Sequence, residues 1–196
     1  MDLRAPDVRD VLLRLSANPL LRGVRHVVQS EPDDHFMQRD DFMRGIAALA
    51  EFGLTYDILI VARQLPSAIE LARTFPAQRF VLDHIAKPDI RSGALQPWAR
   101  DIEALAACGN VSCKLSGMVT EADWRRWTPA DFAPYVEQVT ACFGPERLMF
   151  GSDWPVCTVA GDYARVRALA EVHLGPLNAD ERDAVFGGNA ARIYGV

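Results

Sequence analysis

Two polar side chains, Asp153 and His84, occur at the ends of segments whose other residues are typical of buried β-strands. Asp153 ends the segment RLMFGSD and precedes Trp154, and His84 is the second-last residue of RFVLDHI. Strands of a parallel sheet covered by helices are normally almost wholly apolar, so polar residues here need a reason. A carboxylate and an imidazole that meet at the carboxyl ends of such strands could activate water and polarise a carbonyl group. We therefore predict that Asp153 and His84 are catalytic residues.

A lysine interrupts another predicted strand. Lys114 lies in VSCKLSG, where Ser112 and Ser116 share its parity and the alternate positions are apolar. Because strand side chains alternate between two faces, these three residues form a polar row that suits the inside of a barrel mouth. A buried lysine needs an acidic partner or a ligand, so Lys114 is a candidate for binding substrate. Asp57, on a neighbouring predicted strand, is interpreted as a structural ion-pair partner of Arg25 or Lys114.

The first predicted strand, GVRHVVQ, also carries polar residues. Arg25 and His26 are adjacent, so only one of them can point to the inner face. Arg25 shares its parity with Gln29, which makes that pair the better candidate for contact with substrate. His26 is kept as a further substrate-binding candidate.

Short strand-like segments alternate with amphipathic helical ones along the whole chain. The predicted strands are 23–29, 55–61, 79–85, 111–117 and 147–153. The predicted helices are 6–17, 41–52, 67–75, 98–108, 128–144, 163–174 and one from 178 onward, and Thr128-Pro129-Ala130-Asp131 is a helix-start signal. Strands that alternate with helices predict βα units and a parallel sheet, and therefore the α/β class.

Two α/β architectures remain open at this point, a doubly wound open sheet and a closed (β/α)₈ barrel. No G-x-G-x-x-G or G-x-x-x-x-G-K-[ST] segment follows a strand, which weakens the nucleotide-binding forms of the open sheet. A barrel of eight units needs about 250 residues, whereas this chain of 196 residues contains about five units.

Composition excludes several classes of protein. Apolar residues make up 49% and charged residues 24% of the chain, which argues against disorder. With a net charge of −5 and no basic stripe, a nucleic-acid partner is not expected. No apolar run is long enough to span a membrane, the N-terminus has no signal-peptide pattern, and no Cys-x-x-Cys pair occurs. A reducing, cytoplasmic location is therefore the expectation.

With these residues in view, the chain resembles the amidohydrolase superfamily, and within it the amidohydrolase-2 (amidohydrolase-related) branch of L-fuconolactonase-like lactonases. The matching segments, in the order of the family, are GVRHVVQSEPDD (23–34), FVLDHIAKP (80–88), CKLSGMVTEADW (113–124), LMFGSDWPV (148–156) and VFGGNAARIYG (185–195). The resemblance extends over nearly the whole chain, and the combination of FGSDWP, LDH-x-x-KP and KLSG is specific.

The resemblance implies a (β/α)₈ TIM barrel in which the five strands of this chain are the fourth to the eighth. It implies that Asp153 is the last-strand acid that activates the hydrolytic water, that His84 is the sixth-strand histidine, and that Lys114 lies on the seventh strand. Trp154 would border the substrate. The implied reaction is the opening of a small sugar-acid or carboxylated lactone by attack of water on the ring carbonyl.

One departure from the family pattern concerns metal. The superfamily begins with a His-x-His pair on its first strand, and no His-x-His occurs here. The resemblance allows a divalent metal such as zinc in the full-length family, but His84 and Asp153 are too few for a metal site. We therefore predict no cofactor and no tightly held metal in these residues. The chain is interpreted as one amidohydrolase-related domain, residues 1–196, that lacks the N-terminal part of the barrel.

Two alternatives to the lactonase hypothesis are kept. Within the same superfamily, the activity could be metal-dependent amide hydrolysis or decarboxylation, because a fold does not fix its chemistry. In a different class, the chain could be a non-catalytic partial barrel that acts by self-association. The expected partner is a small-molecule lactone, and no nucleic acid or membrane is expected. A homo-oligomer is compatible with the sequence.

Overall fold

A single parallel sheet organises the protein, which is described by a computed structural model covering residues 1–196. The strands are β1 (Gly23–His26), β2 (Thr55–Ile58), β3 (Phe80–Leu82), β4 (Val111–Leu115) and β5 (Leu148–Phe150). They lie side by side in the order β1-β2-β3-β4-β5, and each neighbouring pair is parallel. Spatial order therefore equals sequence order, as in successive βα units of a barrel, and β1 and β5 form the two edges.

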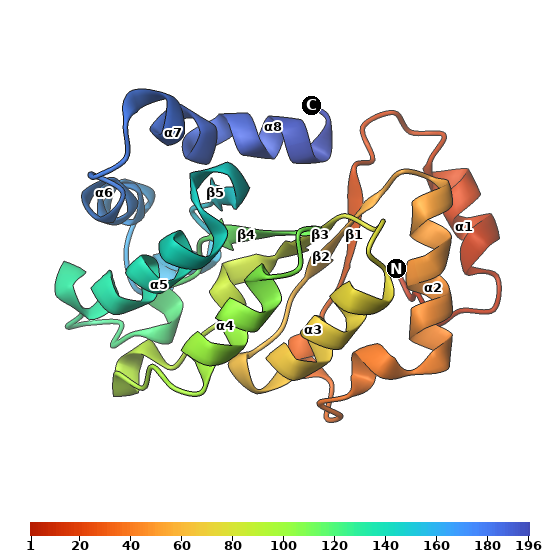
Figure 1. The fold of residues 1–196 in the computed structure, drawn as a ribbon, viewed down its shortest axis with the longest axis horizontal. Helices are drawn as coiled ribbons and strands as arrows, with labels where there is room; N and C mark the ends of the chain where they lie inside the picture. Colours follow the sequence, from red (N-terminus) through yellow and green to blue (C-terminus); the bar gives the residue numbers. More distant parts are fainter.

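Helices connect the strands. They are α1 (Val8–Leu15), α2 (Asp40–Glu51), α3 (Leu65–Thr74), α4 (Trp98–Ala106), α5 (Ala133–Phe143), α6 (Tyr163–His173), α7 (Ala179–Asp183) and α8 (Asn189–Tyr194). Helices α2, α3, α4 and α5 follow one another along one side of the strands, while α7 and α8 lie apart from that row (Figure 1). The predicted order of strands and helices, and with it the α/β class, is confirmed.

The two faces of the sheet differ, as the alternation in β4 predicts. Val111, Cys113 and Leu115 are buried in the main apolar core, whereas Ser112 and Lys114 on the opposite face are only partly buried. Apolar side chains on one face suit packing against helices, and polar ones on the other suit a site. The polar row is therefore the inner face expected of a barrel.

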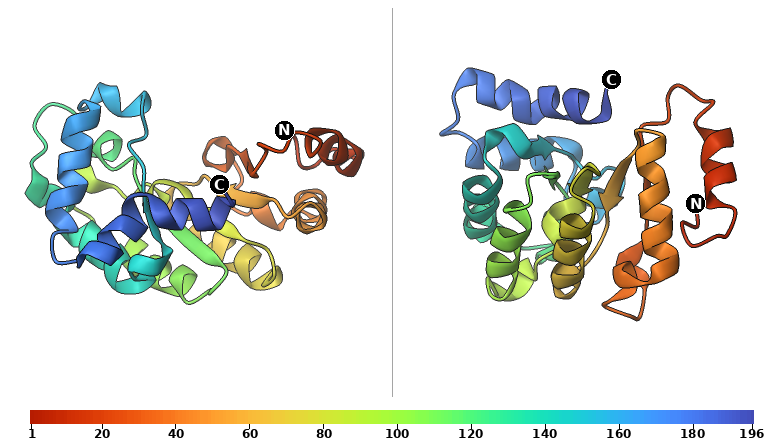
Figure 2. Two further views of the ribbon diagram at one scale, coloured as in Figure 1. Left: turned by 90° about the horizontal axis from the view of Figure 1, so that it is seen from above. Right: turned by 45° about the vertical axis from the view of Figure 1, so that its right-hand side comes forward.

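The C-terminal helix lies against that inner face. Ile193 of α8 packs with Val81 and Met149 in a small apolar cluster of its own, and Tyr194 borders it. The segment α7–α8 crosses the strands instead of joining the row of helices on the far side (Figure 2). Asn189 fixes the start of α8, because its amide donates to the backbone carbonyls of Pro145 and Leu148 over 2.6 and 2.7 Å.

Capping hydrogen bonds occur at Thr128 and at Asn178, where helices are predicted to begin. The carboxylate of Asp131 accepts a hydrogen bond of 2.7 Å from the backbone N–H of Thr128, at a 3₁₀ turn that leads directly into α5. The side chain of Asn178 caps α7 by accepting from the N–H of Glu181. These local bonds satisfy donors that a helix end would otherwise leave unpaired.

The strands are shorter than predicted, and this corrects the placement of several polar residues. Gln29 lies in a 3₁₀ turn after β1, Asp83 and His84 lie in a turn after β3, and Asp153 lies three residues beyond β5. Strand propensity shows that a segment fits a pleated surface, but the ladder ends where its neighbouring strand ends. His84 is therefore not a strand residue. Gln29 lies outside β1, so the alternation of strand side chains does not place it on the face of Arg25.

None of the helices has both the length and the apolar character needed to cross a membrane.

The anchoring of α8 can be tested by Asn189→Ala. We expect the free energy of unfolding to fall by about 1–3 kcal/mol, because two backbone carbonyls lose their buried donor. Chemical denaturation measures the change. Asn18→Ala is the matched control, since the Asn18 side chain accepts only an exposed N–H, and it should leave stability nearly unchanged. Equal effects of the two substitutions would contradict the anchoring role.

Candidate active site

The structure brings His84 and Asp153 together at the carboxyl ends of the strands. The Nε2 atom of His84 lies 3.7 Å from Oδ1 of Asp153, and their side chains are 12% and 16% exposed. His84 comes from the turn after β3 and Asp153 from the turn after β5, so β4 lies between their two strands. A titratable pair in this position of a parallel α/β sheet is the arrangement expected of an enzyme site.

Both residues sit on left-handed backbone. His84, Ile85, Ala86 and Lys87 have φ angles of 55°, 47°, 59° and 49°, and Asp153 has 57°. Left-handed conformation costs L-residues about 1–2 kcal/mol each, and a β-branched residue such as Ile85 tolerates it poorly. Conformations of this kind persist where the surrounding structure enforces them, and they cluster at functional sites.

Packing and one buried hydrogen bond hold the turn in place. Ile85 and Ala86 are fully buried in the main core. The indole N–H of Trp98, in α4, donates to the carbonyl oxygen of Ile85 over 2.8 Å. The turn therefore ends the β3 strand at His84, and the buried side chains of Ile85 and Ala86 hold the turn against the core.

The imidazole of His84 is enclosed by the chain that follows β4. Its Nδ1 atom lies 2.9 Å from Oγ of Ser116. A Cβ atom at Gly117 would lie only 2.7–2.8 Å from Cγ, Cβ and Nδ1 of His84, so the ring occupies space that any other residue would fill. Burial lowers the pKa of His84, and the carboxylates of Asp153 and Asp83 only partly offset this effect. The neutral imidazole is therefore favoured.

A network of ion pairs lies beneath the His84–Asp153 pair. Lys114 lies 2.6 Å from a carboxylate oxygen of Asp57 and 2.8 Å from one of Asp83. The other oxygen of the fully buried Asp83 accepts from the guanidinium of Arg25 over 2.9 Å. The hydroxyl of Tyr194 donates to Asp57 from α8, over 2.7 and 2.9 Å to its two oxygens.

The charges in this network stabilise Lys114 as an ammonium ion. Burial by itself lowers the pKa of Lys114, but the carboxylates of Asp83 and Asp57 outweigh it and the net pKa is raised. Burial raises the pKa of Asp57, and the ammonium offsets part of that rise. Of the two alternatives for Lys114, acidic partner or ligand, the structure supplies the first. The partner of Asp57 is Lys114, while Arg25 pairs with Asp83.

The remaining predicted substrate-binding residues differ in how exposed they are. Arg25 uses one nitrogen for Asp83, and its side chain is 48% exposed, so the rest of the guanidinium is accessible at the inner face. Gln29 is partly buried, and its Oε1 atom is buried without a hydrogen-bond partner. Trp154, adjacent to Asp153, is 68% exposed.

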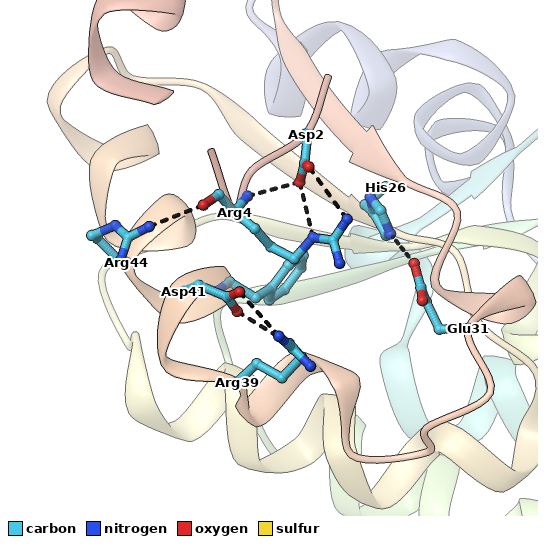
Figure 3. A network of polar contacts seen from close by, with 8 residues as sticks. Asp2, Arg4, His26, Glu31, Arg39, Asp41 and Arg44 are labelled. Atoms are coloured by element: carbon cyan, nitrogen blue, oxygen red, sulfur yellow. Dashed lines mark hydrogen bonds and ion pairs between the residues drawn. The ribbon is translucent and has the colours of Figure 1, made fainter. Parts of the chain in front are cut away.

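His26 faces away from this group. Its Nε2 atom lies 2.7 Å from a carboxylate oxygen of Glu31, and its ring stacks on Phe36 at a centroid distance of 4.9 Å. Figure 3 shows this pair beside the contacts of Asp2 and Arg4 near the N-terminus. The structure therefore gives His26 a structural environment and does not bring it to His84 or Asp153.

Two residues of the site, Asp83 and Tyr194, are not among the predicted site residues, and Ser116 is predicted only as part of the polar row with Lys114. Asp83 had a signal, a carboxylate next to His84 in an apolar segment, and Ser116 had one in its parity with Lys114. Tyr194 had none, because it reaches Asp57 from 137 positions away.

A zinc ion needs more donors than this chain brings together. Three protein ligands are usual for a catalytic zinc, and residues 1–196 contain no group of three His, Cys, Asp or Glu side chains placed to hold a metal. His84 and Asp153 are two donors and do not complete such a set.

Comparisons with known proteins match the chain over all or nearly all of its length. The amidohydrolase family profile matches residues 1–196. An L-fucono-1,5-lactonase of Burkholderia multivorans is 43% identical over 204 residues, which cover 98% of this chain and 69% of that protein. A crystal structure of an amidohydrolase from Burkholderia multivorans with bound HEPES superposes with a TM-score of 0.94 at 41% identity, covering 100% of this chain and 72% of that one. A second crystal structure from this organism, with bound zinc, gives 0.91 at 42% identity and the same coverage.

The seat of the His84 ring can be tested by Gly117→Ala, with Gly93→Ala as its control. Both glycines have positive φ, 63° and 72°, but only at Gly117 would an added Cβ atom have neighbours within 4 Å. We expect Gly93→Ala to cost about 1 kcal/mol for the left-handed backbone, and Gly117→Ala to cost at least about 1 kcal/mol more because it displaces His84. Thermal or chemical denaturation measures both, and equal losses would show that the ring is not tightly seated.

The role of Lys114 can be tested by Lys114→Met, which leaves Asp57 without a cation and Asp83 with Arg25 as its one remaining cation. Removing one partner of a buried pair typically costs about 3–5 kcal/mol of stability. This loss should shrink at lower pH, because Asp57, whose pKa is raised by burial, takes up a proton. Denaturation across a pH series measures this. Arg126→Met, which removes an exposed pair with Asp123, should have no measurable effect. A pH-independent loss for Lys114→Met would contradict the charge argument.

Proposed function

The chain belongs to the amidohydrolase family, and from this membership we propose that it opens a small sugar-acid lactone by attack of water on the ring carbonyl. The observation that carries the proposal is the approach of the Asp153 carboxylate to the His84 imidazole, 3.7 Å apart, in a chain that is 43% identical to an L-fucono-1,5-lactonase. This agrees with the hydrolase, and the lactonase chemistry, expected from the sequence. The decarboxylase, amide-hydrolase and self-association hypotheses have no specific observation in their favour.

Asp153 is the general base in this proposal. Its carboxylate takes a proton from a water molecule while the water oxygen forms a bond to the ring carbonyl carbon. The proton then passes to the ring oxygen as the carbon–oxygen bond of the ring breaks, and the product is the open hydroxy acid. One water is consumed, and no other reactant is needed.

His84 stabilises the charge that develops on the carbonyl oxygen. A buried neutral imidazole can donate a hydrogen bond there. Such donors act more strongly when they are fixed before the reaction starts, and the left-handed turn and the Gly117 seat fix this ring.

Substrate recognition is assigned to three partly accessible side chains. Arg25, held by Asp83, offers guanidinium N–H donors to hydroxyl or carboxylate oxygens of the substrate. The side chain of Gln29 is partly buried, and its amide group is the candidate for hydrogen bonding to a substrate hydroxyl. The exposed indole of Trp154 offers an apolar surface to one side of a sugar ring. Lys114 supports Arg25 through Asp83 and is already paired.

We further propose a cytoplasmic location. All four cysteines are unpaired, which suits a reducing compartment. Fractionation of the source cells tests this, and recovery of the protein outside the cytoplasmic fraction would overturn the proposal.

The reaction is tested by Asp153→Asn assayed with L-fucono-1,5-lactone. We expect the rate above the spontaneous reaction to fall by at least about 100-fold, because an amide cannot take the proton. Asparagine tolerates left-handed backbone, so the melting temperature should stay close to that of the parent. Acid release followed at constant pH measures turnover.

Asp162→Asn is the matched control for this experiment. Asp162 lies in the same connection after β5 and caps α6 through its side chain, a role that asparagine fills equally well. Unchanged turnover in Asp153→Asn, or an equal loss in Asp162→Asn, would exclude Asp153 as the base.

A further inference from the structure

The hydroxyl of Ser116 has a single hydrogen-bonding partner, and that partner is the catalytic imidazole. Its Oγ atom lies 2.9 Å from Nδ1 of His84, and no other side-chain hydrogen bond involves it. Ser116 is 3% exposed, so water does not compete for this contact. The residue directly follows β4, one position after Leu115.

The other side of the ring decides which way this hydrogen bond runs. A neutral imidazole carries one proton, on either Nδ1 or Nε2. If the proton were on Nδ1, the lone pair of Nε2 would face the carboxylate of Asp153 at 3.7 Å, which is electrostatically unfavourable. With the proton on Nε2, that N–H faces the carboxylate, and Nδ1 becomes an acceptor for the hydroxyl proton of Ser116.

We propose that Ser116 is a positioning residue: it donates its hydroxyl proton to Nδ1 and thereby, together with the Asp153 carboxylate that faces Nε2, holds His84 in the tautomer that carries its proton on Nε2. This inference deepens the proposed function, on which its catalytic consequence rests. Nε2 is the ring nitrogen on the side of Asp153, where the substrate would react. This tautomer therefore makes His84 a hydrogen-bond donor to the carbonyl oxygen and leaves proton abstraction to Asp153.

The local chain is built to keep Ser116 in this position. Gly151, just after β5, approaches it so closely that a Cβ atom there would lie 3.1 Å from Cβ of Ser116. Gly117 on its other side leaves room for the His84 ring. Two small residues from two connections therefore bring a hydroxyl and an imidazole into contact without intervening water.

A serine, a histidine and an aspartate in contact also resemble the group that generates a serine nucleophile. Burial argues against that role here. The hydroxyl of Ser116 is almost fully enclosed, on the side of the ring opposite Asp153, and a ring carbonyl held near Nε2 could not reach it. The two roles make different predictions, so one experiment separates them.

The tautomer can be observed directly by ¹⁵N NMR of histidine-labelled protein without substrate. We expect the His84 signals, assigned by their loss in His84→Gln, to show a protonated Nε2 and an unprotonated Nδ1. In Ser116→Ala, which removes one oxygen atom, the two nitrogens should shift toward a mixture of tautomers. Ser112→Ala is the matched control: Ser112 lies on the same face of β4 but has no bond to His84, and it should leave the signals unchanged.

Kinetics supply the second measurement. Ser116→Ala should lower kcat by about 10–100-fold, the range known for residues that orient metal-binding histidines, with little change in KM because Ser116 does not touch the substrate. A protonated Nδ1 in the parent protein, or an identical tautomer in Ser116→Ala, would overturn the proposal. A mass increase of the parent by one substrate during turnover, absent in Ser116→Ala, would overturn it in favour of a nucleophilic serine. If the tautomer is as expected and no lactone is hydrolysed, the proposed function fails and the positioning role stands.

Discussion

The ammonium group of Lys114 lies between the carboxylates of Asp57 and Asp83, and the site depends on this arrangement. The three residues come from β4, β2 and the first position after β3, so their contacts fix three neighbouring segments of the sheet relative to one another. Arg25 extends the network to β1, and Tyr194 extends it to α8. A buried charge that loses its partner is costly, so each of these contacts constrains the others.

Asp83 links this network to the chemistry above it. Its side chain is held by two cations on the inner face, and the next residue, His84, begins the run of left-handed backbone. The chain can turn sharply at that point because the main core anchors Ile85 and Ala86 below it. Strain in the turn is thus balanced by burial on one side and ion pairs on the other, and the imidazole is presented in one orientation.

Burial gives the two members of the His84–Asp153 pair different tasks. It lowers the pKa of His84, so the imidazole stays neutral and serves as a donor. The neighbouring Asp153 carboxylate is the base of the proposed reaction. The apolar outer face of the sheet packs against helices α2 to α5, and the polar inner face carries the ion-pair network and the site, with α8 lying against part of it.

The sequence by itself determined the order of elements, the parallel sheet, the alternation in β4 and the pairing of Asp153 with His84 at one edge. These features follow from local periodicity and from the rule that parallel strands end on the same side. It also narrowed Lys114 to two roles. Only the tertiary structure decided that Lys114 pairs with Asp57 and Asp83, that Arg25 faces the site and His26 does not, and that Ser116 and Tyr194 belong to it. The strand ends and the left-handed turn also came from the structure alone. The physical reason is that burial, ion pairing and the end of a hydrogen-bonded ladder depend on neighbours distant in sequence, and local residue patterns carry no record of those neighbours.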